Sequence, residues 1–328
     1  MVAGGALVVL VAVAFAVGRF PVTPVQLLAV MWSKLTGAPH GLPASFDVVV
    51  LNVRGPRIAA AILVGAALAA AGSAYQGLFR NPLVSPDILG VSTGAALGAV
   101  VGIYLSLGVV AIQTLAFVMG LGAVVVVYAV VAALRRHDPV LVLVLAGIVI
   151  ATLLGSCVSL LKYLADPYNQ LPAITFWLLG SLASVTAGDV EAVVPSVLVG
   201  LLPLWLLRWR MNVMTLGEDE ARALGVDTRR LRFAVVAAAT LMTAAVVSIS
   251  GVVGWIGLLV PHLARFLVGP DFRRLLPASI LLGAGYLLAV DTLARTVARI
   301  EIPLGVLTAF IGAPFFIWVL AGSRRGWS

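Results

Sequence analysis

The residue types that most often carry chemistry are scarce and scattered in this sequence. The three histidines, His40, His137 and His262, are far apart and form no pair at the spacing of metal ligands. The single cysteine, Cys157, lies in an apolar run, which leaves neither an internal disulfide nor a thiolate metal site. No nucleophile stands beside a candidate base. The sequence therefore predicts no catalytic residue, no metal site and no cofactor held by this chain.

Nucleotide and nucleic-acid binding are disfavoured as well. A phosphate-binding loop of the form G-x-x-x-x-G-K-[ST] needs a lysine after a glycine, and neither Lys34 nor Lys162 follows one. The formal net charge is +8, but the basic residues form no run longer than two adjacent arginines and have no interleaved aromatics. The chain is thus expected to be neither an ATPase nor a nucleic-acid partner.

One ionisable pair lies in an otherwise apolar stretch. Asp291 and Arg295 are one helical turn apart, a spacing that allows them to pair. Ionisable residues within membrane-spanning stretches are functional candidates. We expect the ion pair for Asp291 and a further role for Arg295, against the alternative that both simply pair and reach out of a helix end.

Four glycines recur every four residues at Gly90, Gly94, Gly98 and Gly102. On a helix they would form one bare stripe where a second backbone can approach closely. Helix packing is the plainer interpretation, and a helix that slides beside a conduit is the alternative.

Prolines interrupt the apolar stretches at Gly55-Pro56, Asn81-Pro82, Ser85-Pro86-Asp87 and Asp138-Pro139. Irregular backbone at membrane depth survives only inside protein or against water. For Arg80–Asp87, an ordinary surface turn is an equally good interpretation.

The longest polar stretch inside the chain is Trp209–Leu231. Thr215 is a candidate N-cap, the acidic run Glu218–Glu220 suits a first helical turn, and Gly225 would end the helix. A short amphipathic helix is predicted here, with a plain solvated loop as the alternative.

The elements that position these residues follow from composition. Of 328 residues, 62% are hydrophobic and 10% are charged, whereas a soluble domain carries about 25% charged residues. The chain is therefore predicted to be one all-α integral membrane domain, residues 1–328, of about ten spans of about 20 residues each. Breaks are expected near Gly108, Gly251 and Gly254. The spans are predicted at 2–18, 58–79, 89–107, 112–134, 140–164, 191–209, 231–250, 252–268, 275–294 and 303–321.

The basic residues orient this topology. With both termini on one side, fourteen fall on the terminal side: Arg80, Arg135, Arg136, Arg208, Arg210, Arg222, Arg229, Arg230, Arg232, Arg265, Arg273, Arg274, Arg324 and Arg325. Seven fall on the other: Arg19, Lys34, Arg54, Arg57, Lys162, Arg295 and Arg299. Because basic loops stay in the cytoplasm, we expect both termini there. The arginines on the outer side then need a specific reason.

Three segments of the chain resemble one known family. They are Arg54–Gly98 ("RGPRIAAAILVGAALAAAGSAYQGLFRNPLVSPDILGVSTGAALG"), Ser250–Pro277 ("SGVVGWIGLLVPHLARFLVGPDFRRLLP") and Glu301–Leu320 ("EIPLGVLTAFIGAPFFIWVL"). They are similar to the FecCD-type permeases of bacterial ABC importers, which take up haem, ferric siderophores and cobalamin. The resemblance runs over nearly the whole chain from about Val22.

This resemblance implies a type II ABC importer architecture in the bacterial inner membrane. It implies a homodimer of ten-helix permeases, two ATPase subunits that bind ATP and Mg, and a periplasmic substrate-binding protein. Arg54, Arg57 and Arg295 match outward arginines that meet carboxylates of the binding protein, with internal pairing as the alternative. Asn81, Pro82 and Leu83 match residues near a cytoplasmic gate. The segment of about 211–230 matches the element coupling to the ATPase, with Glu218, Asp219, Glu220, Ala221, Ala223, Leu224 and Gly225 at its centre.

The sequence departs from many relatives at Arg295–Glu301, which is about a residue or more shorter and adds Arg299. The substrate is expected to be an iron chelate, haem first and ferric siderophore next, with cobalamin or molybdate as alternatives. A secondary transporter is the rival of another class. It would need buried acids near the midplane, and only Asp291 is a candidate.

Overall fold

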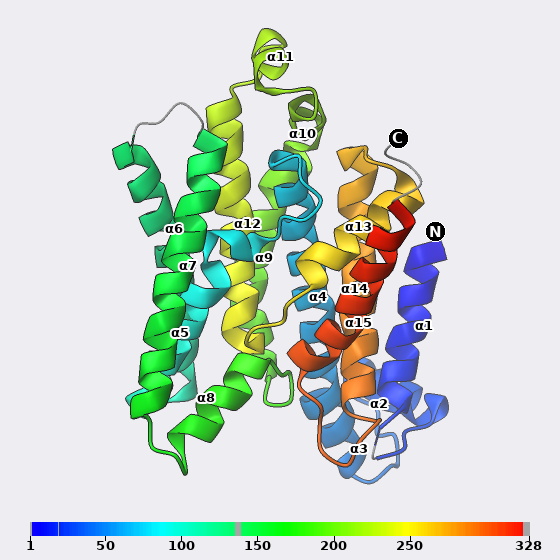
Figure 1. Ribbon diagram of the computed structural model, residues 1–328. Coiled ribbons are helices and arrows are strands. Elements are labelled where there is room, and N and C mark those ends of the chain that lie inside the picture. The colour runs from blue at the N-terminus through cyan, green and yellow to red at the C-terminus, as the bar shows by residue number, and fades with distance from the viewer. Residues whose placement is uncertain (1, 19, 135–138, 324–328) are drawn as a thin grey trace.

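The computed structural model describes residues 2–18, 20–134 and 139–323, and these residues form a bundle of helices (Figure 1). Ten helices match the ten predicted spans: α1 (Val2–Ala16), α4 (Gly55–Leu78), α5 (Val91–Tyr104), α6 (Val109–Leu134), α7 (Pro139–Leu164), α9 (Ala187–Leu206), α12 (Thr228–Ser250), α13 (Ile256–Val268), α14 (Phe272–Ala294) and α15 (Leu304–Ser323). Among the described residues, six helices are long and apolar enough to cross a membrane, and α1, α5, α13 and α15 are among the shorter apolar helices. The prediction of an all-α membrane protein is confirmed.

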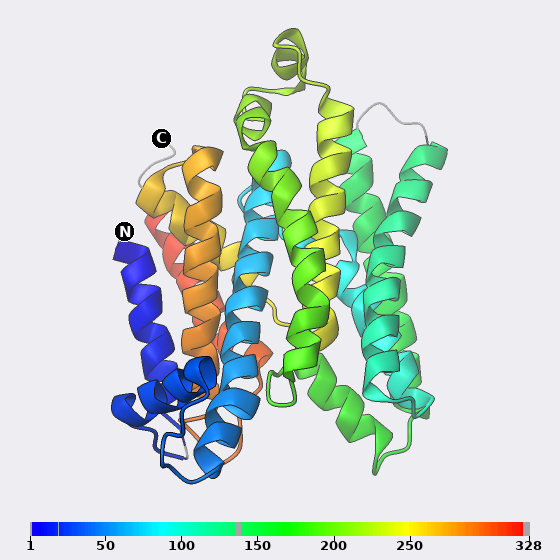
Figure 2. The same cartoon turned by 180° about the vertical axis from the view of Figure 1, so that it is seen from behind.

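The chain runs up and down through the bundle, so that α1 begins and α15 ends at the same end (Figures 1 and 2). That end also carries α10 (Arg208–Met214) and α11 (Glu218–Ala223), and we call it the α11 end. The opposite end carries α2 (Pro24–Thr36), α3 (Ser45–Asp47) and α8 (Gln170–Leu179), and we call it the α2 end. Some of the basic residues used to predict the topology lie outside the described residues: Arg19, Arg135-Arg136 and Arg324-Arg325.

Helix α4 forms the centre of the bundle. In the most apolar 18-residue stretch of its span, 83% of the residues are buried, against 17% for α7, whose side chains face outward. Glycine makes this central packing possible, because a Cβ at Gly72 would overlap the carbonyl of Gly257 on α13. A Cβ at Gly65 would likewise overlap the carbonyl of Gly283 on α14. These contacts bring backbones of distant segments together, as small residues do in membrane bundles.

The glycine stripe is shorter than predicted. Gly94 and Gly98 lie against α6, where a Cβ at Gly94 would stand 2.6 Å from the carbonyl oxygen of Met119. The prediction that Gly90 belongs to this helical stripe is wrong. Gly90 precedes α5 as its N-cap at φ 79°, a left-handed conformation that glycine adopts without strain. Gly102 faces Ile112 near the start of α6.

The irregular backbone occurs largely where proline and glycine predict it. The connection after α4 contains the 3₁₀ turn η2 (Pro86–Leu89), and α12 and α13 are separated around Gly251 and Gly254. At Gly55-Pro56 the backbone changes from one helix type to another. There, the π-helical segment η1 (Val48–Arg54) continues directly into α4, and the Gly55 N–H donates to the carbonyl of Val50. Asp138 lies outside the described residues.

In the described part of the chain, the helices α2, α3, α8 and α10 were not predicted. Helix α2 has a capping box in which the Thr23 side chain accepts from the Gln26 N–H and the Gln26 side chain from the Thr23 N–H. Helix α8 is a short apolar helix at the α2 end, and α10 leads into α11. The Thr23-Pro24-x-Gln26 pattern was the signal for α2 that the sequence offered.

Candidate functional site

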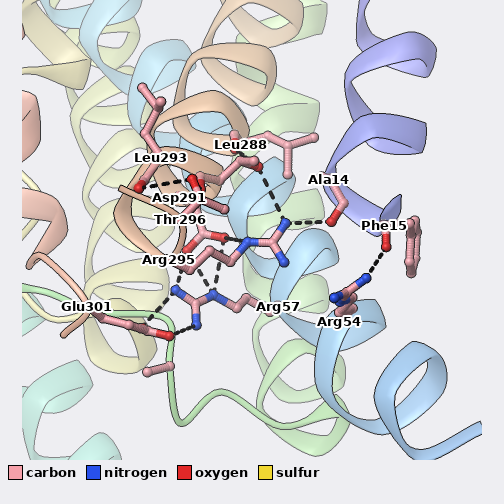
Figure 3. A network of polar contacts seen from close by, with 12 residues as sticks. Ala14, Phe15, Arg54, Arg57, Leu288, Asp291, Leu293, Arg295, Thr296 and Glu301 are labelled. Atoms are coloured by element: carbon pink, nitrogen blue, oxygen red, sulfur yellow. Dashed lines mark hydrogen bonds and ion pairs between the residues drawn. The ribbon is translucent and has the colours of Figure 1, made fainter. Parts of the chain in front are cut away.

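Charged side chains gather at the α2 end in a cluster that we call the ionic cluster: Arg54, Arg57, Asp291, Arg295 and Glu301 (Figure 3). Arg54 ends η1 and Arg57 lies in the first turn of α4. Asp291 lies in the last turn of α14, Arg295 caps that helix, and Glu301 precedes α15. Segments more than 230 residues apart in the sequence meet in this cluster.

Arg57 is the centre of the ionic cluster. Its Nε donates to Oδ1 and Oδ2 of Asp291 at 2.9 and 3.1 Å, and its Nη1 and Nη2 donate to Oε1 and Oε2 of Glu301 at 2.8 and 3.0 Å. The guanidinium thus holds two carboxylates, each through paired hydrogen bonds. Asp291 is fully buried, and the Glu301 side chain is one-third exposed. Asp291 therefore depends on Arg57 for charge compensation, whereas Glu301 has access to solvent.

The predicted pair of Asp291 and Arg295 is the weaker contact of this aspartate. Arg295 Nε lies 3.7 Å from Asp291 Oδ2 and has no hydrogen-bond partner in the described part of the chain. The four-residue interval suggested this pair, because residues at that spacing are neighbours on one helix. The closer partner, Arg57, comes from a different helix and could not be found by spacing.

Two arginines of the cluster cap the end of α1. The Arg54 guanidinium donates to the carbonyls of Phe15 and Phe20, and the Arg295 guanidinium donates to the carbonyl of Ala14. The last carbonyls of a helix have no partner within the helix and carry its negative dipole end, so cations there are favourable. Arg54 and Arg295 therefore attach α1 to α4 and α14.

These contacts give the arginines at the α2 end a role inside the chain. Arg54, Arg57 and Arg295 are 5%, 8% and 9% exposed, and each is engaged with carboxylates or carbonyls of the same chain. The geometry is that of the internal-pairing alternative. Glu301, which the sequence analysis did not name as a partner, is the cluster's most accessible acid.

The second candidate region is α11, which projects beyond the bundle (Figures 1 and 2). Its N-cap is Gly217, so the prediction of Thr215 as the cap is wrong. The helix ends at Ala223, and Gly225 follows in a left-handed conformation at φ 80°. Ala221 is buried. The exposed residues here are Asp219, Glu220, Arg222, Ala223, Leu224 and Gly225.

Helix α11 is fastened to the bundle by charge. Glu218 pairs with Arg222 at 3.0 Å within the helix and also with Arg232 on α12. The Glu218–Arg232 pair joins α11 to a helix that crosses the bundle. A displacement of α11 would therefore be passed to α12.

The turn Asn81–Leu83 lies where α4 ends, and its three residues are exposed. The Asn81 side chain accepts from the Leu83 N–H at 2.9 Å, which closes the turn around Pro82. In the described part of the chain, no three His, Cys, Asp or Glu side chains group as metal ligands would.

Comparison with known proteins identifies the family. The model of the FecCD transport family matches residues 6–322. The chain is 43% identical to a cobalamin import permease, BtuC of Halobacterium salinarum, over 90% of this chain and 81% of the relative. It is 37% identical to the molybdate import permease MolB of Haemophilus influenzae, over 98% and 94% of the two chains.

A hemin transport permease, HmuU of Yersinia pestis, is 38% identical over 84% of each chain. A solved metal-chelate type ABC transporter in an inward-facing conformation superposes with a TM-score of 0.87 at 36% identity, covering 98% of this chain and 97% of the other. Fold, length and sequence agree over nearly the whole chain. The chain therefore belongs to the FecCD transport family and is a membrane-spanning permease subunit of an ABC importer.

Proposed function

We propose that this permease works as a homodimer in the bacterial inner membrane, with two ATPase subunits at the α11 end and a periplasmic substrate-binding protein at the α2 end. Membership of an ABC importer family supports the partners, and the excess of arginine on the terminal side supports cytoplasmic termini. The ATPase subunits bind ATP and Mg and carry out hydrolysis, so the permease itself is no enzyme.

Helix α11 is the element that couples to the ATPase. Its exposed face includes Leu224, which is 57% exposed, beside the acids Asp219 and Glu220. ATP binding draws the ATPase subunits together and moves α11, and the Glu218–Arg232 ion pair passes this motion to α12. The permease thereby alternates between two shapes whose populations the ligands shift. The turn Asn81–Leu83, exposed beside this end, forms part of the cytoplasmic gate.

The binding protein docks at the α2 end, over the ionic cluster. A carboxylate of the partner can reach Arg57 in place of Glu301, whose side chain is one-third exposed, while Asp291 stays bound behind it. Glu301→Gln should then strengthen association with the binding protein, and Arg57→Glu should weaken it, mainly through the association rate at low salt. Unchanged association in both folded variants would exclude Arg57 from docking.

The substrate is an iron chelate, haem first and a ferric siderophore next. The supporting observation is an open, apolar groove of about 650 Å³ between α8, the connection from α12 to α13, and α15, lined by Leu178, Leu179, Val252, Trp255, Val306 and Phe310 among others. None of its described lining residues is charged. Such a wall suits the flat apolar face of a large chelate, whereas a molybdate oxyanion would need hydrogen-bond donors or cations. In a homodimer, two grooves would face a common path.

Cobalamin is the second candidate, because the relative at 43% identity is a cobalamin import permease. The test is ATP-driven uptake into proteoliposomes that contain the permease, its ATPase and its binding protein. Haem, a ferric siderophore, cobalamin and molybdate are compared at equal concentration. We expect haem to accumulate fastest. Accumulation of molybdate alone would refute the argument from the apolar groove, and accumulation of cobalamin alone would establish the second candidate.

A further inference from the structure

A basic cavity lies at the α11 end, between α6, α7 and the start of α12, and its volume is about 740 Å³. We call it the arginine cavity. Its polar part is formed by Arg222, Arg229, Arg230 and Arg232, with Glu218 and Asp227 as the acids in its described lining. The cavity therefore carries an excess of positive charge. The Glu218–Arg232 ion pair of the proposed coupling forms part of its wall, whereas Arg229 and the apolar residues of the cavity have no part in the proposed coupling or substrate path.

The acids of the cavity are already engaged. Glu218 pairs with Arg222 and Arg232, and Asp227 pairs with Arg230 at 3.1 Å while its carboxylate caps α12. Arg229 is exposed and pairs with no acid in the described part of the chain. The positive charge of Arg229 is therefore not balanced by an acid at the first turn of α12, where the helix dipole also favours an anion.

Two side chains that line the cavity each have a buried polar atom without a partner. Arg232 is 9% exposed, and its buried Nε has no hydrogen-bond acceptor in the described structure. The hydroxyl of Tyr128 on α6 is buried and likewise unpartnered. Buried donors are normally satisfied, so two of them beside one cavity point to an acceptor that belongs there.

The opposite part of the cavity is apolar. Tyr128 and Phe233 pack edge to face with ring centroids 6.1 Å apart, and Val131 and Leu143 complete this wall. Phe233 is 63% exposed, and Leu141, two residues before Leu143 on α7, is 54% exposed. Helix α12 is a candidate span, so its first turn lies at the boundary between headgroups and hydrocarbon.

From these observations we infer that the arginine cavity binds the phosphate of an anionic phospholipid headgroup, with the acyl chains lying along α6 and α7. An oxyanion with several acceptors would meet the side chains of Arg229, Arg232 and Tyr128, which line the same cavity. The apolar wall distinguishes a lipid from a free anion or from a partner's carboxylate, neither of which needs exposed aromatic and aliphatic side chains beside it. Basic pockets between membrane helices are suited to such headgroups.

The chain contains its own matched control. Helix α12 begins with Asp227-Thr228-Arg229-Arg230 and α14 begins with Asp271-Phe272-Arg273-Arg274 at the same end of the bundle. Both aspartates are N-caps, and Arg229 and Arg273 are both exposed. Of these two arginines, only Arg229 lines the arginine cavity. Arg229→Gln and Arg273→Gln therefore remove the same charge from equivalent positions.

The test measures lipid retained by the purified full chain, by native mass spectrometry, after incubation with dioleoyl phosphatidylglycerol or dioleoyl phosphatidylcholine. We expect phosphatidylglycerol to be preferred, its affinity to fall roughly fivefold in Arg229→Gln, and Arg273→Gln to match the wild type. Tyr128→Phe, which keeps the ring, should weaken phosphatidylglycerol as well. Equal binding of both lipids, or equal losses in the two arginine variants, would overturn the inference. Displacement of the lipid by inorganic phosphate would instead identify a site for a soluble anion, and would overturn it too.

Discussion

Replacing Arg57 with glutamine should destabilise the folded chain by about 3–5 kcal/mol, the cost of leaving a buried charge without its partner. Asp291 is fully buried, and both of its carboxylate oxygens accept from Arg57 Nε within 3.1 Å. After the substitution, its remaining cation is Arg295, whose Nε lies 3.7 Å away. That single longer contact stabilises the Asp291 carboxylate by less than its burial costs in lost hydration.

The same structure predicts an order of effects across the cluster. Glu301→Gln should cost less than about 1 kcal/mol, because the Glu301 side chain is one-third exposed and Arg57 keeps Asp291. Asp219→Asn is the matched control, because this carboxylate is 93% exposed and pairs with Arg222 at 3.3 Å. It should leave stability unchanged.

The double substitution Arg57→Met with Asp291→Leu tests the cause directly. It removes both charges and keeps apolar volume, so it should recover much of the loss seen in Arg57→Gln. The assay is equilibrium unfolding in mixed micelles with increasing dodecyl sulfate, followed by the fluorescence of the seven tryptophans. The reasoning fails if Arg57→Gln costs no more than Asp219→Asn. It also fails if the double substitution is less stable than the single one.

The remaining predictions concern topology, coupling and packing. In intact spheroplasts, a membrane-impermeant thiol reagent should label His40→Cys and not Asp219→Cys on a cysteine-free background; the reverse pattern would invert the topology. Ala223→Pro should abolish ATP-driven uptake while the spans still assemble, because proline at the last residue of α11 removes a backbone N–H donor and its ring clashes with the preceding turn. Normal uptake by the folded variant would show that α11 does not couple. Gly98→Ala should destabilise the bundle by about 1–3 kcal/mol in the same unfolding assay, because its methyl group overpacks against α6. The control Gly122→Ala has open space at its Cβ and should be neutral. Equal effects of the two substitutions would mean that α5 and α6 are not closely packed.

The sequence alone was enough to predict the spans, because apolar runs of about 20 residues satisfy their backbone in lipid as helices. The breaks near Gly108, Gly251 and Gly254 were also predictable, since glycine favours the irregular backbone found there. The amphipathic helix at Glu218–Ala223 followed from local charge and its terminating glycine. These are properties of neighbours in sequence. The family was predicted from the resemblance of three long segments, Arg54–Gly98, Ser250–Pro277 and Glu301–Leu320.

Partners across the bundle were decided by the tertiary structure alone. Spacing suggested Asp291 with Arg295, but packing of α4 against α14 brought Arg57 closer, from 234 residues away. The same packing turned Arg54 and Arg295 into caps for α1, and Gly72 and Gly257 into a contact between backbones. Gly90 is not part of the helical stripe, because its φ of 79° lies outside a right-handed helix. The four-residue repeat of glycines does not show this. Local sequence sets which segments form helices, whereas the burial of each charge depends on which helices then pack together, and that is settled by shape complementarity over the whole bundle.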